Sequence, residues 1–309
     1  MTDSLTTLRL GARGSALARW QADWVSARLR ELDGVEVELV LISTHGDRNQ
    51  TESIAAGSSQ GVFTKEIQKA LIDGRVDLAV HSLKDLPTDP IKELTLAAVP
   101  PRGPVQDVLV AREAESLADL PQGAVIGTGS LRRRSQLLRV RPDLQMKDVR
   151  GNVDTRLQKL KDGECDALIL ADAGLTRLGW KDHITERLPV DLLLPAVGQG
   201  ALGIETRAGD SNTLRFVEQL NDPDSRAAVI AERSMLATLR GGCLAPVGGW
   251  ARMEEEQLAL SGMVAAMDGS QRLESLLRGS PEEASELGIR VAEDLIAQGA
   301  AELIQDARG

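Results

Sequence analysis

The sequence predicts an α/β protein of two or three domains. The chain has 309 residues, which exceeds the size that one hydrophobic core usually supports. Short β-branched and aliphatic runs alternate with amphipathic helical patterns, as expected for an α/β fold. A strand-to-helix pattern near the N-terminus recurs in the middle of the chain. This recurrence predicts two lobes of similar plan.

The N-terminal segment predicts a strand over Leu8–Ala12, followed by a turn and a helix. Ser15 is placed to cap the N-terminus of this helix, because its hydroxyl can accept a hydrogen bond from a backbone N–H of the first turn. Leu17, Trp20 and Trp24 recur at helical spacing, so we expect them to lie on one face.

The following elements complete the first lobe. A β-branched run predicts a strand over residues 35–42, and the polar stretch Arg48–Gln60 reads as a mobile loop. Further predictions are a helix over 63–73, a buried strand over 77–82, and strands over 94–99 and 107–111 around the turn at 100–104. We expect the chain to cross into another domain at this turn.

The second lobe is predicted from internal similarity. The turn Ile126–Ser130 before the helix LRRRSQLLR parallels the turn Leu10–Ser15 before the first helix, and residues 159–171 parallel residues 70–82, with Asp-Gly-x-x-Asp at the same place. Generic βα repetition is the alternative explanation. Two such lobes predict a ligand held between them, where helix N-termini offer N–H groups to carboxylates or phosphates.

A third, small α/β domain is expected at the C-terminus. The strand-like run 201–207 is expected to return to the first lobe, and from about residue 226 the pattern is helix, loop 240–249, and short strands over 257–262 and 263–269. A final helix starts at Ser280 as the cap. The predicted domains are residues 1–99 with 200–220, residues 105–195, and residues 225–309.

Charge is distributed unevenly along the chain. The net charge is −10, but residues 131–160 contain nine Lys or Arg against three Asp, so this segment carries +6 and the rest carries −16. A basic segment in an acidic protein favours a small polyanionic ligand over a long nucleic-acid track. Without tyrosine, and with only two Phe and four Trp, base-stacking surfaces are scarce. The alternative is a solvated basic helix face.

The loop RGGCLAPVGG places Cys243 between a glycine pair and a proline. Gly241 and Gly242 permit unusual backbone angles and Pro246 fixes φ, so such a loop can present a thiol outward; a small buried cysteine is the alternative. Cys165 and Cys243 are not expected to form a disulfide. The sequence contains no cysteine or histidine spacing typical of metal sites, no P-loop and no complete G-x-G-x-x-G.

Charged residues at strand ends and helix starts are the candidate binding groups. Lys84 and Asp85 follow the strand that ends near His81, where they would form an acid/base site or a plain surface ion pair; His81 itself is expected to be packed. Three arginines, 132–134, open a helix, where the dipole disfavours cations unless an anion lies there. Arg150 and Arg156 flank a further strand-to-helix turn.

Five motifs together resemble the porphobilinogen deaminase family, also called hydroxymethylbilane synthases. They occur in order over almost the entire chain: AVHSLKDLPT (79–88), GTGSLRRRSQL (127–137), VRGNVDTRLQKL (149–160), LPAVGQGALGIE (194–205) and RGGCLAPVG (240–248). The resemblance implies a three-domain enzyme whose first two lobes resemble type II periplasmic binding proteins, with a small α/β C-terminal domain.

The resemblance also implies the chemistry. The enzyme polymerises four porphobilinogen molecules into 1-hydroxymethylbilane with release of ammonia, in tetrapyrrole biosynthesis. A dipyrromethane cofactor is attached through a thioether to the cysteine of the GGC loop, here Cys243, and the acid is Asp85. Each pyrrole carries an acetate and a propionate, which would give the basic segment its ligand.

Carried over by motif, the remaining roles are also implied by the resemblance. The residues that hold the cofactor's carboxylates are Ser82, Lys84, Thr128, Ser130, Arg132 and Arg133. The residues that receive substrate or the growing chain are Arg13, Ser15, Phe63, Arg150, Arg156, Arg177 and Gln199. The chain departs from the family pattern at Gln60, where many members have a lysine, and at Arg134, which extends the usual arginine pair.

The expected partner is porphobilinogen as substrate, with product handed to a downstream cyclising enzyme, and neither nucleic acid nor membrane is expected to bind. We expect a monomer located in the cytoplasm, or in an organelle stroma after loss of a transit peptide. The competing hypothesis is a non-catalytic bilobal binding or regulatory module. Cys243 and Asp85 discriminate between the two, because simple carboxylate capture needs neither a presented thiol nor a strand-end acid.

Overall fold

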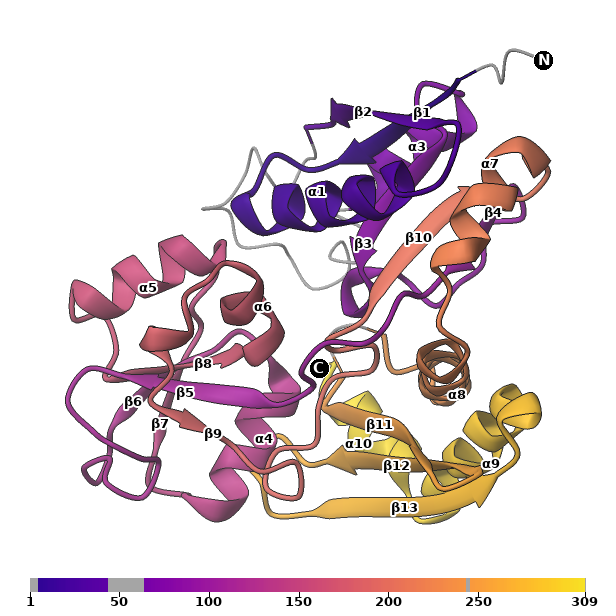
Figure 1. Ribbon diagram of the computed structural model, residues 1–309. Helices are drawn as coiled ribbons and strands as arrows, with labels where there is room; N and C mark the ends of the chain where they lie inside the picture. The colour runs from indigo at the N-terminus through magenta and orange to yellow at the C-terminus, as the bar shows by residue number, and fades with distance from the viewer. Residues whose placement is uncertain (1–4, 44–63, 243–244, 309) are drawn as a thin grey trace. The chain divides into compact units, whose positions relative to one another are not determined.

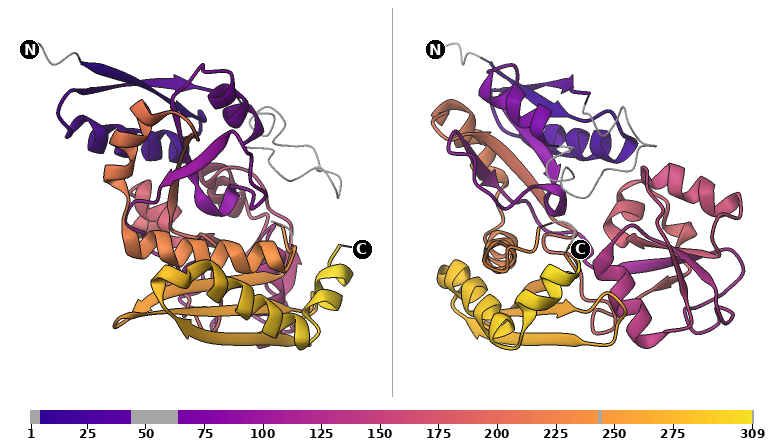
Figure 2. Two further views of the ribbon diagram at one scale, coloured as in Figure 1. Left: turned by 90° about the vertical axis from the view of Figure 1, so that its right-hand side faces the viewer. Right: turned by 180° about the vertical axis from the view of Figure 1, so that it is seen from behind.

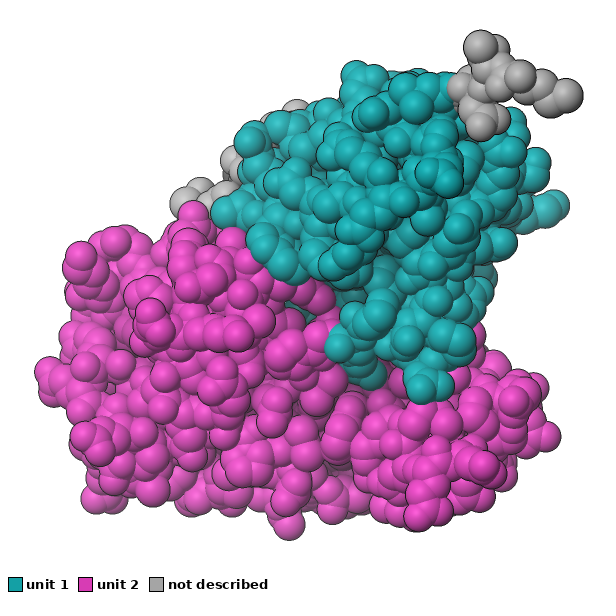
Figure 3. All heavy atoms as spheres, in the orientation of Figure 1, with its two compact units in different colours: residues 1–102, 201–226 teal, residues 103–200, 227–309 magenta. Residues whose placement is uncertain are grey.

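The computed structural model of the protein describes residues 5–43, 64–242 and 245–308 (Figure 1). The chain forms two compact units, coloured separately in Figure 3: residues 1–102 with 201–226, and residues 103–200 with 227–309. Strands and helices alternate in both units, which confirms the predicted α/β class. The second lobe and the C-terminal sheet fall within one unit, and the finer three-domain boundaries stay a prediction.

The first unit contains a five-stranded sheet of order β2-β1-β3-β10-β4. Its strands are β1 (Thr6–Ala12), β2 (Val35–Leu41), β3 (Leu78–Ser82), β4 (Leu94–Ala98) and β10 (Leu202–Arg207). Strand β1 is parallel to β2 and β3, whereas β10 is antiparallel to β3 and β4. The predicted return of the chain at 201–207 is confirmed, because β10 lies in this sheet.

Helices cover this sheet through two separate apolar clusters. The helices are α1 (Ala16–Arg30), α3 (Lys65–Ile72), α7 (Ser211–Val217) and the 3-10 turns η1 (Leu83–Asp85) and η3 (Glu218–Leu220). Ser15 caps α1 as predicted, with its Oγ accepting from the Ala18 N–H at 3.3 Å. The buried face of α1 is not the face that the sequence predicted. Val25 and Leu29 are fully buried, while Trp20 and Trp24 are only half-buried.

The second unit begins with a sheet of order β7-β6-β8-β5-β9. Its strands are β5 (Asp107–Ala111), β6 (Val125–Gly127), β7 (Gln145–Lys147), β8 (Ala167–Ala171) and β9 (Glu186–Arg187). The helices are α4 (Leu131–Val140), α5 (Val153–Lys161), α6 (Asp172–Arg177) and the 3-10 turn η2 (Lys181–His183). Strand β6 is parallel to β7 and β8, and β5 is antiparallel to β8 and β9.

The two sheets follow one plan, so the predicted internal repeat is confirmed. Strands β2, β1, β3, β10 and β4 correspond in order and direction to β7, β6, β8, β5 and β9. The repeated Asp-Gly-x-x-Asp motif has a shared function. Its second aspartate, Asp77 or Asp166, accepts the backbone N–H of Arg9 or Val125 on the neighbouring strand. The motif therefore fastens the start of the strand to its neighbour.

A three-stranded antiparallel sheet, β11 (Val247–Glu254), β12 (Gln257–Ala265) and β13 (Arg272–Gly279), completes the second unit. The helices α8 (Pro223–Thr238), α9 (Ala284–Ala297) and α10 (Ala300–Asp306) pack against one face (Figure 2). The boundary between the two units falls within α8, after residue 226.

Three sequence predictions for this region need correction. The strands expected over 257–262 and 263–269 form one strand, because Gly262 faces the helices, where an added Cβ would lie 2.5 Å from Met235 Sδ. The final helix starts with a 3-10 turn, η4 (Pro281–Glu283), and the Ser280 side chain makes no capping hydrogen bond. Strands β11 and β13 and helix α10 were not predicted.

Candidate functional site

The hydroxyl groups of two predicted binding residues hold the start of helix α4 in place. Ser130 is the N-cap and its Oγ accepts from the Arg133 N–H at 3.4 Å, while Thr128 Oγ1 accepts from the Ser130 N–H at 3.2 Å. This turn places Arg132 and Arg133 in the first turn of the helix. Both side chains point inward, because the two residues are only 3% and 6% exposed.

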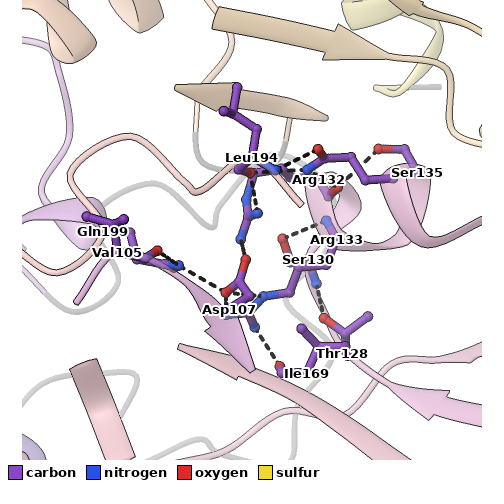
Figure 4. Close-up of polar contacts among 11 residues, drawn as sticks. Val105, Asp107, Thr128, Ser130, Arg132, Arg133, Ser135, Ile169, Leu194 and Gln199 are labelled. Atoms are coloured by element: carbon purple, nitrogen blue, oxygen red, sulfur yellow. Dashed lines mark hydrogen bonds and ion pairs between the residues drawn. The ribbon is translucent and has the colours of Figure 1, made fainter. Parts of the chain in front are cut away.

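Both arginines form ion pairs with the carboxylate of Asp107 (Figure 4). Arg133 donates from Nε at 3.1 Å and from Nη2 at 2.6 Å to Oδ1, and Arg132 Nη2 lies 2.7 Å from Oδ2. Gln199 Nε2 also donates to Oδ1, at 3.0 Å. Asp107 is fully buried at the first position of β5. Three predicted site residues thus converge on one carboxylate.

Backbone carbonyl groups fix the outer ends of the same side chains. Arg132 Nη1 donates to the Leu194 carbonyl at 2.6 Å, and Arg133 Nη1 donates to the Ile169 carbonyl at 2.8 Å. Leu194 itself is held by Gln136, whose amide accepts its N–H at 2.8 Å and donates to its carbonyl at 3.1 Å. The orientation of the guanidinium groups is therefore determined from several elements at once.

The electrostatics of this cluster leave one positive charge in excess, since two guanidinium groups face one carboxylate. Burial lowers the pKa of Arg132, Asp107 raises it and Arg133 lowers it, and the resulting pKa lies below that of an ordinary arginine. The Arg132 Nε–H is buried and finds no hydrogen-bond acceptor among the described residues. Excess positive charge and an unsatisfied N–H suit an anionic ligand such as a carboxylate.

The first unit carries the predicted acid. Strand β3 ends at Ser82, and the 3-10 turn that follows holds Lys84, which is half-buried, and Asp85, which is exposed. Gln21 of α1 donates to Ser82 Oγ at 2.7 Å, which fixes the hydroxyl at the strand end. Arg13 follows β1 and is half-buried.

His81 is packed, as the sequence predicted. It is 5% exposed and its Nε2 lies 3.2 Å from Glu205 Oε2 on β10. Gln68 of α3 donates to the other oxygen of Glu205 at 3.1 Å. These contacts tie the strand that precedes Lys84 and Asp85 to its neighbours in the first unit.

The remaining predicted arginines of the second unit lie outside the Asp107 cluster. Arg150 is exposed and its Nε donates to Asp148 at 2.9 Å, and Arg156 Nε donates to the Gly151 carbonyl at 2.8 Å. Arg177 Nη2 donates to the Gly200 carbonyl at 2.6 Å. Burial lowers the pKa of Arg177 to about 10.

The structure groups only some of the predicted site residues. Thr128, Ser130, Arg132, Arg133 and Gln199 belong to the Asp107 cluster, whereas Arg150, Arg156 and Arg177 do not. Arg13, Ser15, Ser82, Lys84 and Asp85 belong to the other unit. Phe63, Cys243 and the loop Arg48–Gln60 lie outside the described residues.

Sequence reasoning missed Asp107 and Gln136. A helix dipole disfavours cations at the helix start unless an anion lies nearby, and here that anion is a carboxylate of the chain itself. Asp107 left one signal, because it is a charged residue that opens the otherwise apolar strand DVLVA. Gln136 left none, since a glutamine within a polar helix is typical of an exposed position.

The described ranges contain neither a membrane-spanning helix nor a cluster of metal ligands. Within residues 5–43, 64–242 and 245–308, no helix has the length and apolar character needed to cross a membrane. In the same ranges, no three His, Cys, Asp or Glu residues gather in a way that could hold a metal ion.

Comparison with known proteins identifies the family. The family described as "Porphobilinogen deaminase, dipyromethane cofactor binding domain" matches residues 8–215, and its C-terminal domain matches residues 226–297. This chain belongs to the porphobilinogen deaminase family. The porphobilinogen deaminase of Pelotomaculum thermopropionicum is 45% identical over 302 residues, covering 97% of each chain. That of Geobacter metallireducens is 46% identical over 300 residues, covering 97% of this chain and 94% of the relative.

Solved structures show more distant similarity. The methionine-binding protein MetQ aligns with 69% of this chain and 89% of its own, with a TM-score of 0.47 and 12% identity. A likeness of this degree carries no information about function.

Proposed function

We propose that this chain is a hydroxymethylbilane synthase, which joins four porphobilinogen molecules into the linear tetrapyrrole 1-hydroxymethylbilane with release of ammonia. The observation that carries the proposal is the match of residues 8–215 to the cofactor-binding domain of the porphobilinogen deaminase family. The buried cluster around Asp107 supports it, because two fixed guanidinium groups with excess positive charge suit a ligand that carries carboxylates.

The dipyrromethane cofactor, when bound, supplies the pyrrole carbon to which the first substrate is joined. Its proposed attachment is a thioether to Cys243. The donors available for its carboxylates fit the group chemically, since hydroxyls, an ammonium and guanidinium groups all hydrogen-bond to carboxylates. In this proposal they are Ser82, Lys84, Thr128, Ser130, Arg132 and Arg133.

Asp85 is the proposed catalytic acid. Loss of ammonia from porphobilinogen leaves positive charge on the pyrrole, and a carboxylate stabilises that charge while it accepts or returns a proton at the pyrrole nitrogen. Its place at the end of β3, on an exposed turn, supports this role. Strand ends in α/β sheets are where ligands commonly bind.

The substrate's acetate and propionate require separate cationic partners as the chain grows. We assign this function to Arg13, Ser15, Arg150, Arg156 and Arg177, with Gln199 and Phe63 as further contacts. The exposure of Arg150 supports its assignment, because an arriving carboxylate can compete with its Asp148 partner in water. The proposal also includes a monomer in the cytoplasm that hands its product to a cyclising enzyme.

Intact mass under denaturing conditions tests the covalent attachment. Freshly purified protein is expected to exceed the sequence mass by two pyrrole units, and Cys243→Ser is expected to show the bare mass. Cys165→Ser is the matched control. Cys165 is buried, and burial raises the pKa of its thiol, so it is unreactive. A wild-type protein that is active at the bare mass contradicts the proposal.

A further inference from the structure

Asp107 is outside the machinery proposed above, yet it contacts three members of it. The two oxygens of its carboxylate contact different partners. Oδ1 accepts from Arg133 and Gln199, whereas Oδ2 faces Arg132. One carboxylate therefore fixes the separation of three side chains that come from α4 and from the segment before β10. No other side chain drawn in Figure 4 contacts both arginines through charge.

We propose that Asp107 is the positioning residue of the carboxylate-binding cluster and that it leaves the cluster one negative charge short, so that the cluster is completed by a single ligand carboxylate. This inference rests on the proposed function, because the ligand is a pyrrole carboxylate. It adds a residue that acts through Arg132 and Arg133 and does not touch the reacting atoms.

Repulsion between Arg132 and Arg133 creates the need for a carboxylate at Asp107. Arg132 and Arg133 are adjacent cations, both buried, and at short separation two like charges repel strongly in a weakly polar interior. Asp107 offsets this repulsion and orients both groups, since Nε and Nη2 of Arg133 approach the same oxygen. Without the carboxylate, the guanidinium groups lose their fixed orientation, and their mutual repulsion is no longer offset.

The cluster has more positive than negative charge and more donors than acceptors. One carboxylate balances one of two guanidinium groups, and a buried net charge is costly unless a counter-ion arrives. The buried Arg132 Nε–H has no acceptor among the described residues. One ligand carboxylate would supply the missing charge and bring acceptor oxygens to this region, whereas a second carboxylate would make the cluster net negative.

The same lobe contains a matched control for Asp107. Asp172 is 2% exposed at the start of α6 and accepts from Arg187 Nε and from Thr176 Oγ1, both at 2.8 Å. Like Asp107, it is a buried aspartate paired with an arginine. Neither Arg187 nor Thr176 is a predicted site residue, so the loss of Asp172 is purely structural.

The first experiment compares Asp107→Asn with Asp172→Asn. The measured quantities are the thermal midpoint and the fraction of purified molecules that carry two extra pyrrole units by intact mass. We expect both variants to lose stability, but only Asp107→Asn to lose cofactor occupancy, by about tenfold or more. Equal occupancy in Asp107→Asn and the wild type overturns the proposal, as does an equal loss in both variants.

The second experiment tests the charge and remains decisive if the asparagine variant folds poorly. Asp107→Ala is prepared and incubated with porphobilinogen in the presence of formate or of formamide, which is a neutral molecule of the same shape. We expect formate to restore cofactor incorporation at least about fivefold better than formamide, because only formate replaces the missing carboxylate. No restoration by formate, or equal restoration by both, overturns the proposal.

The wild type separates this inference from the proposed function. If the wild-type protein never acquires two pyrrole units, the proposed function fails. If the wild type acquires them and Asp107→Asn acquires them equally well, the function stands and the role of Asp107 fails.

Discussion

In the first lobe, β3 ends at Ser82 and β10 begins opposite it with Leu202. In the second lobe, the equivalent pair is Ala171 at the end of β8 and Asp107 at the start of β5. One register position therefore holds an apolar side chain in one lobe and a buried carboxylate in the other. The segments that follow also differ, since the first lobe places the exposed Asp85 in a 3-10 turn whereas the second begins helix α6 with the buried Asp172.

The same scaffold places carboxylates in two different environments. The second lobe buries its acid beneath arginines, which suits the binding of carboxylates. The first lobe leaves its acid exposed at the strand end, which suits proton transfer and the stabilisation of positive charge. Shared topology thus says little about a site, because function depends on the side chains at equivalent strand ends.

The largest expected effect concerns the exposed acid of the first lobe. Asp85→Asn should lower the rate of bilane formation by at least about 100-fold, because the amide neither carries charge nor exchanges a proton. The free energy of unfolding should change by no more than about 0.5 kcal/mol, since the side chain is exposed.

Product formation and urea unfolding measure these two effects. Asp89→Asn is the control, because it removes another exposed carboxylate from the loop that follows. Near-normal bilane formation by Asp85→Asn, with the cofactor attached, would remove Asp85 from its proposed role and erase the contrast between the lobes.

An intermediate effect is expected at the equivalent glycines Gly11 and Gly127. An added Cβ at Gly127 would lie 2.6 Å from Leu168 Cδ2 and 2.8 Å from Val149 Cγ2, whereas at Gly11 the nearest atom is at 3.1 Å. Gly127→Ala should cost about 1–3 kcal/mol through overpacking, and Gly11→Ala less than about 1 kcal/mol. Chemical denaturation of both variants measures the difference. Equal losses would mean that the two strand-to-helix turns tolerate substitution alike.

The smallest effect concerns the aspartates of the repeated motif. Burial raises the pKa of Asp77. Hydrogen bonds from the side chain and backbone of Arg9 and from Arg207 lower it by a larger amount, so the resulting pKa lies below the ordinary 3.8. The stabilising contribution of Asp77 is therefore complete at pH values well above 3.8. It is lost as the pH falls through the lower pKa of the folded state. The unfolded chain binds the proton first, which sets the sign.

Asp77→Asn should lower the free energy of unfolding near neutral pH by about 1–2 kcal/mol and flatten its decline below pH 4. Urea unfolding at pH 7 and pH 3.5 measures both quantities. Asp166→Asn is the control from the second lobe, where the ion pair with Arg112 is longer, at 3.4 Å, and more exposed. An unchanged acid slope in Asp77→Asn would contradict the assignment.

Much of the fold was predictable because local signals agree with the tertiary structure. Ser15 caps a helix as predicted, and the Asp-Gly-x-x-Asp repeat marks two equivalent strands. The misses have tertiary causes. Gly262 reads as a strand breaker, yet it lies within β12 because the helices packed against it leave no space for a side chain.

The candidate site was predictable only in part. The arginine-rich helix start indicated a bound anion, but the sequence did not indicate that Asp107 provides it from a strand 26 residues away along the chain. Long-range pairing of this kind depends on the register of β5 against β8, which no local pattern records. Motif resemblance supplied Asp85 and Cys243, and Gln136 became visible only from its hydrogen bonds to Leu194.

The placement of β10 has a consequence for synthesis of the chain. This strand lies between β3 and β4, yet it follows the entire sheet of the second lobe in the sequence. During translation, β3 and β4 emerge early and have no partner between them until residues 202–207 leave the ribosome, whereas the strands of the second lobe are contiguous in sequence. The second lobe can therefore complete its sheet first, and the N-terminal lobe is the later one to become fully hydrogen-bonded.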